Sequence, residues 1–134
     1  DMIPEMFGYD AIIIQSMEEA WPDFDGAIKF YDGLRQDHLM TLAVLGWKLY
    51  ERFGYIYHPD YTYLYCDTEQ TEVCIALNKF ATSPMCIIRH GWLPGNHPEA
   101  DELHKMHESG ESYQRDLEVY NERKKNNFYV EQLA

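Results

Sequence analysis

Residues 37–53 read DHLMTLAVLGWKLYERF and are followed by Gly54. When this stretch is placed on a helix, its few polar residues collect on one narrow stripe, so apolar groups cover most of the circumference. Gly54 stands where glycine commonly ends a helix, because glycine adopts the left-handed conformation at little cost. We therefore predict a central helix over 37–53, and its expected buried side chains include Leu42, Leu45, Leu49 and Phe53.

Two helices are predicted between the N-terminus and this stretch. Apolar side chains recur at helical spacing after Asp10, which can serve as the N-cap. These features predict a helix over 11–20, although the run of three isoleucines also suits a buried strand. Residues 22–26 form a predicted turn, from which Asp25 caps a short helix that ends near Leu34.

After Gly54 the apolar pattern changes from helical to alternating, and Tyr, Val, Ile and Thr dominate as far as His90. Alternation of this kind is typical of half-buried β-strands. We predict an antiparallel meander with strands at 55–57, 61–66, 72–78 and 85–89. In the expected register, Tyr61, Tyr63 and Tyr65 share one face of the second strand, opposite the apolar face.

The C-terminal segment is predicted to form a long acidic helix. Pro98 is well placed as its first residue, and apolar residues recur every three or four positions from Leu103 to Tyr120. Ser109 and Gly110 interrupt this seam, so a kink or break is expected there. Together the elements predict one α+β domain over 1–134, in which N-terminal helices pack on a three- or four-stranded antiparallel meander beside the long C-terminal acidic helix.

The composition supports a folded, intracellular domain. A hydrophobic fraction of 46% excludes a disordered chain, because such a chain has too little apolar surface to offset its conformational entropy. Cys66, Cys74 and Cys86 form no CxxC pair, which favours reduced thiols over a disulfide framework or a zinc ribbon. No secretory signal opens the chain, and its best apolar stretch, 39–47, is too short to cross a bilayer. We expect a cytoplasmic protein without a membrane partner.

The charge balance is the most unusual property of the composition. The chain has 23 acidic residues and 11 basic ones, which gives a formal net charge of -12 at pH 7. A field of this sign disfavours direct contact with nucleic-acid phosphates and speeds encounter with basic protein surfaces. Solubility alone is the alternative explanation of the charge.

Few patterns in the sequence indicate chemistry. His97, Asp101, His104 and Glu108 have metal-ligand spacing along the predicted last helix. They are rotated by about 200° from its apolar seam, so they are expected to face solvent and to form no metal site. Signature motifs for nucleotide, hydrolase and calcium sites are absent from the sequence. The sequence therefore predicts no catalytic residue, no metal and no cofactor.

These observations favour a small acidic interaction protein that binds a basic surface of another protein. One form of it is a nucleic-acid-mimicking inhibitor, such as a phage accessory protein. The predicted partner-binding residues are the acidic clusters and the tyrosine stripe: Glu18, Glu19, Asp23, Asp25, Tyr61, Tyr63, Tyr65, Glu99, Asp101, Glu102, Glu108 and Glu111. One alternative is a small enzyme or ligand-binding protein whose pocket lies between sheet and helix and uses tyrosines, His90 and carboxylates. Another is a structural or assembly subunit.

Overall fold

The computed structural model describes residues 2–91 and 110–134 of the chain. Its central sheet has three strands in the order β3-β2-β4. The middle strand, β2 (Ala27–Phe30), pairs antiparallel with β3 (Val44–Leu45) and parallel with β4 (Phe80–Ser83). The parallel pair requires a long crossover connection between β2 and β4, because the two strands run in the same direction.

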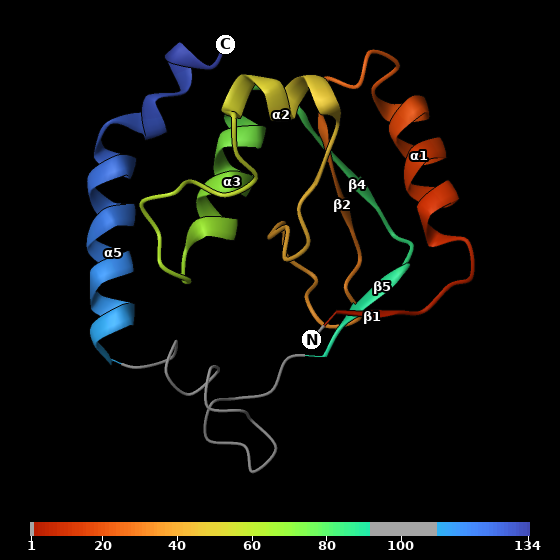
Figure 1. The fold of residues 1–134 in the computed structure, drawn as a ribbon, viewed down its shortest axis with the longest axis horizontal. Coiled ribbons are helices and arrows are strands. Elements are labelled where there is room, and N and C mark those ends of the chain that lie inside the picture. The colour runs from red at the N-terminus through yellow and green to blue at the C-terminus, as the bar shows by residue number, and fades with distance from the viewer. Residues whose placement is uncertain (1, 92–109) are drawn as a thin grey trace.

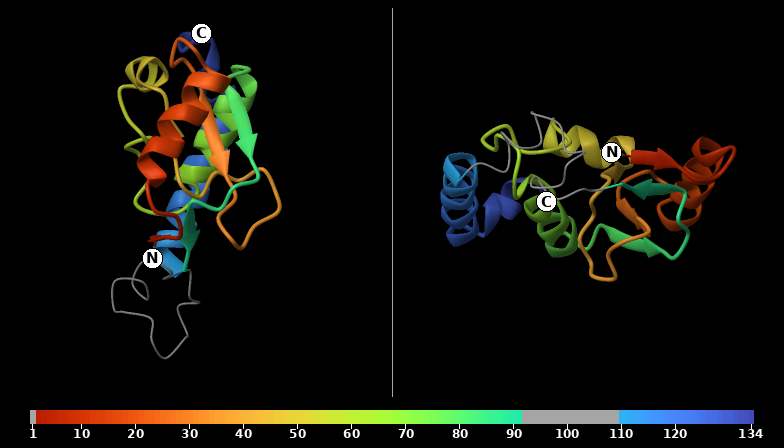
Figure 2. Two further views of the ribbon diagram at one scale, coloured as in Figure 1. Left: turned by 90° about the vertical axis from the view of Figure 1, so that its right-hand side faces the viewer. Right: turned by 90° about the horizontal axis from the view of Figure 1, so that it is seen from below.

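Helices lie on both sides of this sheet. α1 (Tyr9–Ala20) packs against one face, and α3 (Cys66–Ala76) packs on the other face, where it contacts β4. The short α2 (Trp47–Phe53) belongs to the crossover (Figure 1). α5 (Gly110–Lys125) and the 3₁₀ helix η1 (Asn127–Gln132) form the side farthest from α1, as the right-hand view in Figure 2 shows.

A second, smaller sheet brings the start of the chain beside its middle. β1 (Met2–Pro4) pairs antiparallel with β5 (Ile88–His90), and Met2 lies opposite His90. The backbone N–H of His90 also donates to the carbonyl oxygen of Asp32, at 2.8 Å. This bond ties the small sheet to the loop that follows β2.

The alternating side chains of β2 divide the core into two clusters. Ile28 and Phe30 face α1 and pack with Met17. Ala27 faces the other way and belongs to the cluster that contains Leu49. All four residues of β2 are buried, as expected of a strand with a layer on each face.

The α+β class is confirmed, and so is the predicted helix over 11–20. α1 begins at Tyr9, two residues earlier than predicted. Its N-cap is Gly8, with φ 72°, and Asp10 lies in the first turn, where a carboxylate is favoured by the helix dipole. The N-cap prediction for Asp10 was therefore wrong by two positions.

The predicted helix over 37–53 is wrong except for its last two turns. Residues 31–43 form an irregular loop, β3 follows, and only α2 is helical. Gly54 ends α2 with φ 73°, as predicted. Leu49 and Phe53 are buried, whereas Leu42 and Leu45 are only partly buried.

Contacts between residues distant in sequence explain why the first part of the predicted helix, residues 37–46, is not helical. The N–H of Gly46 donates to the carbonyl of Gly26 at 2.8 Å, and the N–H of Lys48 donates to the carbonyl of Phe24 at 3.1 Å. A Cβ at position 46 would lie 2.2 Å from the Phe24 carbonyl oxygen, so only glycine fits there. Pairing with β2 therefore outweighs the local helical pattern.

The short helix predicted to end near Leu34 is also wrong, because its residues include β2. The antiparallel meander is wrong as well. Residues 55–65 are irregular, and the strand predicted at 72–78 lies mostly in α3. The last predicted strand, 85–89, overlaps β5 by two residues. The pattern missed α3 because its buried residues include Glu69, Gln70 and Thr71, so the apolar period of a helix is absent.

The C-terminal helix is described from Gly110 to Lys125, and the predicted part from Pro98 to Ser109 lies outside the described residues. Over its 16 described residues, α5 is not acidic, because four acidic residues face four basic ones. In the predicted seam Tyr120 is buried, but Tyr113 is 47% exposed.

Candidate functional site

The loop 31–43 takes its shape from Asp32, which is 3% exposed. Oδ1 of Asp32 accepts the N–H groups of Leu34, at 2.9 Å, and Arg35, at 2.8 Å. Oδ2 accepts the hydroxyl of Thr41 at 2.8 Å. Burial by itself would raise the pKa of Asp32, but these hydrogen bonds outweigh burial and lower that pKa. The carboxylate thus stays charged and fixes the loop.

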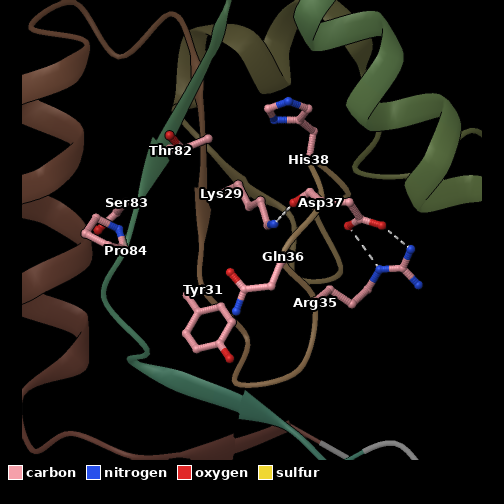
Figure 3. A pocket seen from close by; sticks show the side chains of 9 residues that line it. All are labelled: Lys29, Tyr31, Arg35, Gln36, Asp37, His38, Thr82, Ser83 and Pro84. Carbon is pink, nitrogen blue, oxygen red and sulfur yellow. Dashed lines mark hydrogen bonds and ion pairs between the residues drawn. The ribbon is translucent and has the colours of Figure 1, made fainter.

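A cavity of about 370 Å³ lies between this loop and the ends of two strands. β2 and β4 are parallel, so their carboxyl ends meet at one edge, the position at which open α/β sheets commonly bind ligands. Figure 3 shows the lining side chains, of which those on or next to the strands are Lys29, Tyr31, Thr82, Ser83 and Pro84. The loop contributes Arg35, Gln36, Asp37 and His38.

Lys29 is the least expected residue of this lining, because it is a charged side chain within a buried strand. It is 7% exposed and lies opposite Thr82 in the β2–β4 register. Its ammonium donates a hydrogen bond to the carbonyl oxygen of Asp37 (Figure 3). An ammonium carries three N–H donors, so two donors of Lys29 remain for other acceptors.

Among the described residues, no carboxylate lies within ion-pair distance of Lys29, and its charge acts on the carboxylate of Asp37 only from farther away. Within residues 2–91 and 110–134, every other lysine and arginine lies within ion-pair distance of a carboxylate. Arg35, the other strongly basic residue of the lining, is bound to Asp37 and turns away from the strands (Figure 3). That hydrogen-bonded pair raises the pKa of Arg35 and lowers the pKa of Asp37.

Uncharged polar groups complete the lining. The hydroxyls of Tyr31 and Thr82 and the amide of Gln36 make no side-chain hydrogen bond to any described residue. Ser83 accepts the N–H of Met85 at 3.3 Å and keeps its own hydroxyl proton for another acceptor. Among the described residues, the cavity therefore combines one positive charge that has no ion-pair partner with several unused hydrogen-bond donors.

The other buried charges are bonded within the protein. Asp25 accepts two hydrogen bonds from Arg52, at 2.8 and 2.6 Å, and Lys79 lies 2.9 Å away. The bonds from Arg52 hold the pKa of Asp25 well below its usual range. Glu69 of α3 accepts three hydrogen bonds of 2.8–3.0 Å from Arg123 of α5.

Asp116, which is fully buried on α5, holds the irregular segment before α3. Its carboxylate accepts the backbone N–H groups of Thr62, Tyr63 and Leu64, at 2.9, 2.8 and 2.8 Å. Burial alone would raise the pKa of Asp116, but the three bonds outweigh burial and lower that pKa. Asp116 is therefore part of the scaffold.

Those of the predicted acidic residues that the structure describes do not gather on one surface. Glu18 and Glu19 are exposed on α1, and Glu111 is exposed at the start of α5, at the opposite end of the molecule (Figure 1). Asp23 is exposed and lies 3.9 Å from Lys48, whereas Asp25 is buried. Glu99, Asp101, Glu102 and Glu108 lie outside the described residues, as do His97 and His104.

The predicted tyrosine stripe is not part of a sheet, since its residues lie in the irregular segment before α3. Tyr61 is half-buried and donates its hydroxyl to Glu69, and the hydroxyl of Tyr65 bonds that of Tyr113 at 2.8 Å. Tyr63 is 43% exposed. The three rings therefore have different surroundings.

The cysteines are free, as predicted, and none is activated. Burial raises the pKa of Cys66 to about 11 and that of Cys74 to about 12. The pKa of Cys86 is raised as well, chiefly by burial. Thiols with raised pKa values hold little thiolate near pH 7, which makes them poor nucleophiles.

The sequence analysis missed the cavity and Lys29. The signal was present, because a lysine in the short apolar run AIKF, residues 27–30, is unusual if that run is a buried strand. The prediction of a helix over these residues removed the anomaly, since a helix would place the lysine on a solvent-facing side. Thr82 and Ser83 carried no signal of their own.

No protein-family model, curated protein or solved structure matches the chain. Among the residues that the structure describes, no three His, Cys, Asp or Glu side chains are grouped closely enough to hold a metal ion. In the same part of the chain, the helices are too short or too polar to span a membrane. The case for a function therefore rests on the cavity itself.

Proposed function

We propose that the protein binds a small organic anion in the cavity beside Lys29. The observation that carries this proposal is the buried ammonium of Lys29, which is the one described lysine or arginine charge without a carboxylate partner. Burying an uncompensated charge is costly, so such a charge is expected to meet its counter-ion from outside the chain. The volume of about 370 Å³ falls in the range of roughly 300–1,000 Å³ that is typical of ligand pockets.

The lining favours a tetrahedral oxyanion, such as a phosphate monoester, over a planar carboxylate. Carboxylates are commonly recognised by the two-pronged guanidinium of arginine, and Arg35 is already bound to Asp37. The ammonium of Lys29 and the hydroxyl of Thr82 are single-point donors, which suit phosphate oxygens that accept from several directions. The net charge of -12 does not oppose this at short range, because salt screens distant charges within about 8 Å.

The test compares phenyl phosphate with phenol by isothermal titration calorimetry. The wild-type protein is expected to bind phenyl phosphate at least tenfold more tightly than phenol. Lys29→Met should weaken the binding of phenyl phosphate by roughly 10- to 100-fold, because a hydrogen bond to a charged group is worth about 1.5–3 kcal/mol. Lys48→Met removes an exposed, paired lysine and is the matched control, expected to leave this affinity unchanged. If the Lys29→Met variant and the wild type bind phenyl phosphate with equal affinity, the proposal is wrong.

A second proposal is the binding of a basic protein surface, and the exposed face of α1 favours it. Ile14 is 55% exposed on this helix and is followed one turn later by exposed Glu18 and Glu19. An apolar side chain beside carboxylates suits a partner that is both basic and apolar. A double Glu18→Lys, Glu19→Lys variant should bind a lysine-rich peptide more weakly at low salt, by surface plasmon resonance. Unchanged binding would remove α1 from the proposal.

A further inference from the structure

A second cavity, of about 650 Å³, has a different chemistry. Its walls are mainly apolar and aromatic, and they include Leu34, Leu39, Tyr57 and Tyr65. They come from the loop 31–43, from the irregular segment before α3, from the first turn of α3 and from the small sheet, through Met2 of β1 and His90 of β5. The cavity near Lys29 is lined by polar groups, so the two cavities are built for different ligands.

Asp67 is the one carboxylate in the lining of the second cavity. Its Oδ1 accepts the backbone N–H of Thr68 at 2.8 Å and the hydroxyl of Thr68 at 3.4 Å. No described residue donates a hydrogen bond to Oδ2, and no described lysine or arginine lies within ion-pair distance of Asp67. Burial raises the pKa of Asp67, and the charge of Arg35, which lies beyond ion-pair distance, offsets only part of that rise.

The remaining ionisable groups of this lining do not supply that cation. Arg35 lowers the pKa of Asp67 through its charge, but its guanidinium is hydrogen-bonded to the carboxylate of Asp37 and makes no ion pair with Asp67. Burial lowers the pKa of His90, so its imidazole is mostly neutral at pH 7. Burial also raises the pKa of Tyr57 to about 12 and that of Cys66 to about 11, so both are neutral. Asp67 is thus the only charge of the lining that has no ion-pair partner among the described residues.

We infer that this cavity binds an organic ammonium ion, with Asp67 as its counter-ion and tyrosine rings as its walls. Aromatic faces attract organic cations by about 0.5–2 kcal/mol each, and aromatic cages are the usual means of recognising substituted ammonium groups. The site rests on observations other than those that carry the proposed function, although Arg35 lines both cavities.

The position of Asp67 in the first turn of α3 offers a purely structural role, because the helix dipole favours a carboxylate there. That role requires only the bond from Thr68 to Oδ1. Asp10 occupies the first turn of α1 in the same way, is exposed and lines neither cavity. Asp10→Asn is therefore the matched control for the loss of a helix-terminal charge.

The experiment titrates benzylammonium and the neutral benzyl alcohol into the protein, by calorimetry and by NMR shift mapping. Benzylammonium should bind at least tenfold more tightly than benzyl alcohol. Asp67→Asn should weaken benzylammonium at least tenfold and leave benzyl alcohol unchanged, whereas Asp10→Asn and Lys29→Met should change neither. The shifts should centre on Tyr57, Leu64 and His90, and this mapping decides the matter if the Asp67→Asn variant does not fold. Equal binding of the two probes, an unaffected Asp67→Asn variant, or shifts centred elsewhere would overturn the inference.

Discussion

Two largely covered cations of this protein, Arg123 and Lys29, have different partners. The guanidinium of Arg123, whose side chain is 12% exposed, makes three hydrogen bonds to the carboxylate of Glu69. The ammonium of Lys29, in a side chain that is just as well buried, has only the carbonyl oxygen of Asp37. Arg123 joins α5 to α3, whereas Lys29 borders a cavity at the end of the sheet.

The difference separates a structural charge from a binding charge. A paired charge has its interactions satisfied inside the chain, so removing either partner leaves the other one buried and uncompensated. An unpaired charge beside a cavity contributes nothing comparable to folding, and its interaction is available to a ligand. Measurements of stability and of binding should therefore respond in opposite ways at the two places.

The largest expected effect is the loss of stability in Glu69→Gln. This substitution keeps the shape of the side chain but leaves Arg123 buried without a counter-ion, which costs about 3–5 kcal/mol in comparable cases. Urea unfolding should show that decrease in the free energy of unfolding. Glu122→Gln, at the exposed pair with Lys125, is the control and should change it by less than about 0.5 kcal/mol. A loss below about 1 kcal/mol at Glu69 would contradict the structural role of this pair.

The next effect concerns acid, through Asp25. The folded protein lowers the pKa of Asp25, chiefly through Arg52, so the stabilisation is present above the unfolded pKa of about 3.9. This stabilisation is lost as the pH falls below that value toward the lower pKa that Asp25 has in the folded protein. Asp25→Asn should therefore lower the free energy of unfolding by about 2–3 kcal/mol at pH 7. It should also flatten the decline in stability between pH 5 and pH 2, measured by urea unfolding at each pH. An unchanged slope would mean that Asp25 is not a source of the acid sensitivity.

The smallest expected effect on stability is that of Lys29→Met. The substitution removes a buried charge, fills a similar volume and loses one hydrogen bond to the carbonyl oxygen of Asp37. Replacing buried charges by apolar groups is often neutral or stabilising, so the free energy of unfolding should stay within about 1 kcal/mol of wild type or rise. A loss above about 2 kcal/mol would make Lys29 a structural residue like Arg123.

The same contrast shows what the sequence could and could not predict. α1 and the end of α2 at Gly54 follow from local signals, namely helical spacing and a glycine with a left-handed backbone. β2 and β3 depend on partners distant in sequence, so a local apolar run was misassigned to helices. α3 was missed because a buried glutamate with a distant arginine partner has no periodic signature.

The candidate site could be predicted less well than the fold. The second cavity is lined by tyrosines and His90, which the predicted enzyme or ligand-binding pocket would use, but that pocket was expected between sheet and helix and without Asp67, and it stays a prediction. Lys29 could not be recognised without β2, because its importance comes from being buried between two layers. Its missing counter-ion is a property of the tertiary structure, and no spacing along the chain encodes it.

The most direct measurement is the effect of phenyl phosphate on the free energy of unfolding. A ligand that binds only the folded state stabilises it by about 2.7 kcal/mol at a concentration 100 times its Kd. Urea unfolding with this ligand should show that gain for the wild type and for Lys48→Met, and almost none for Lys29→Met. The same gain in all three proteins, or no gain in the wild type at any attainable concentration, would contradict the account of Lys29 as a charge kept for an anionic ligand.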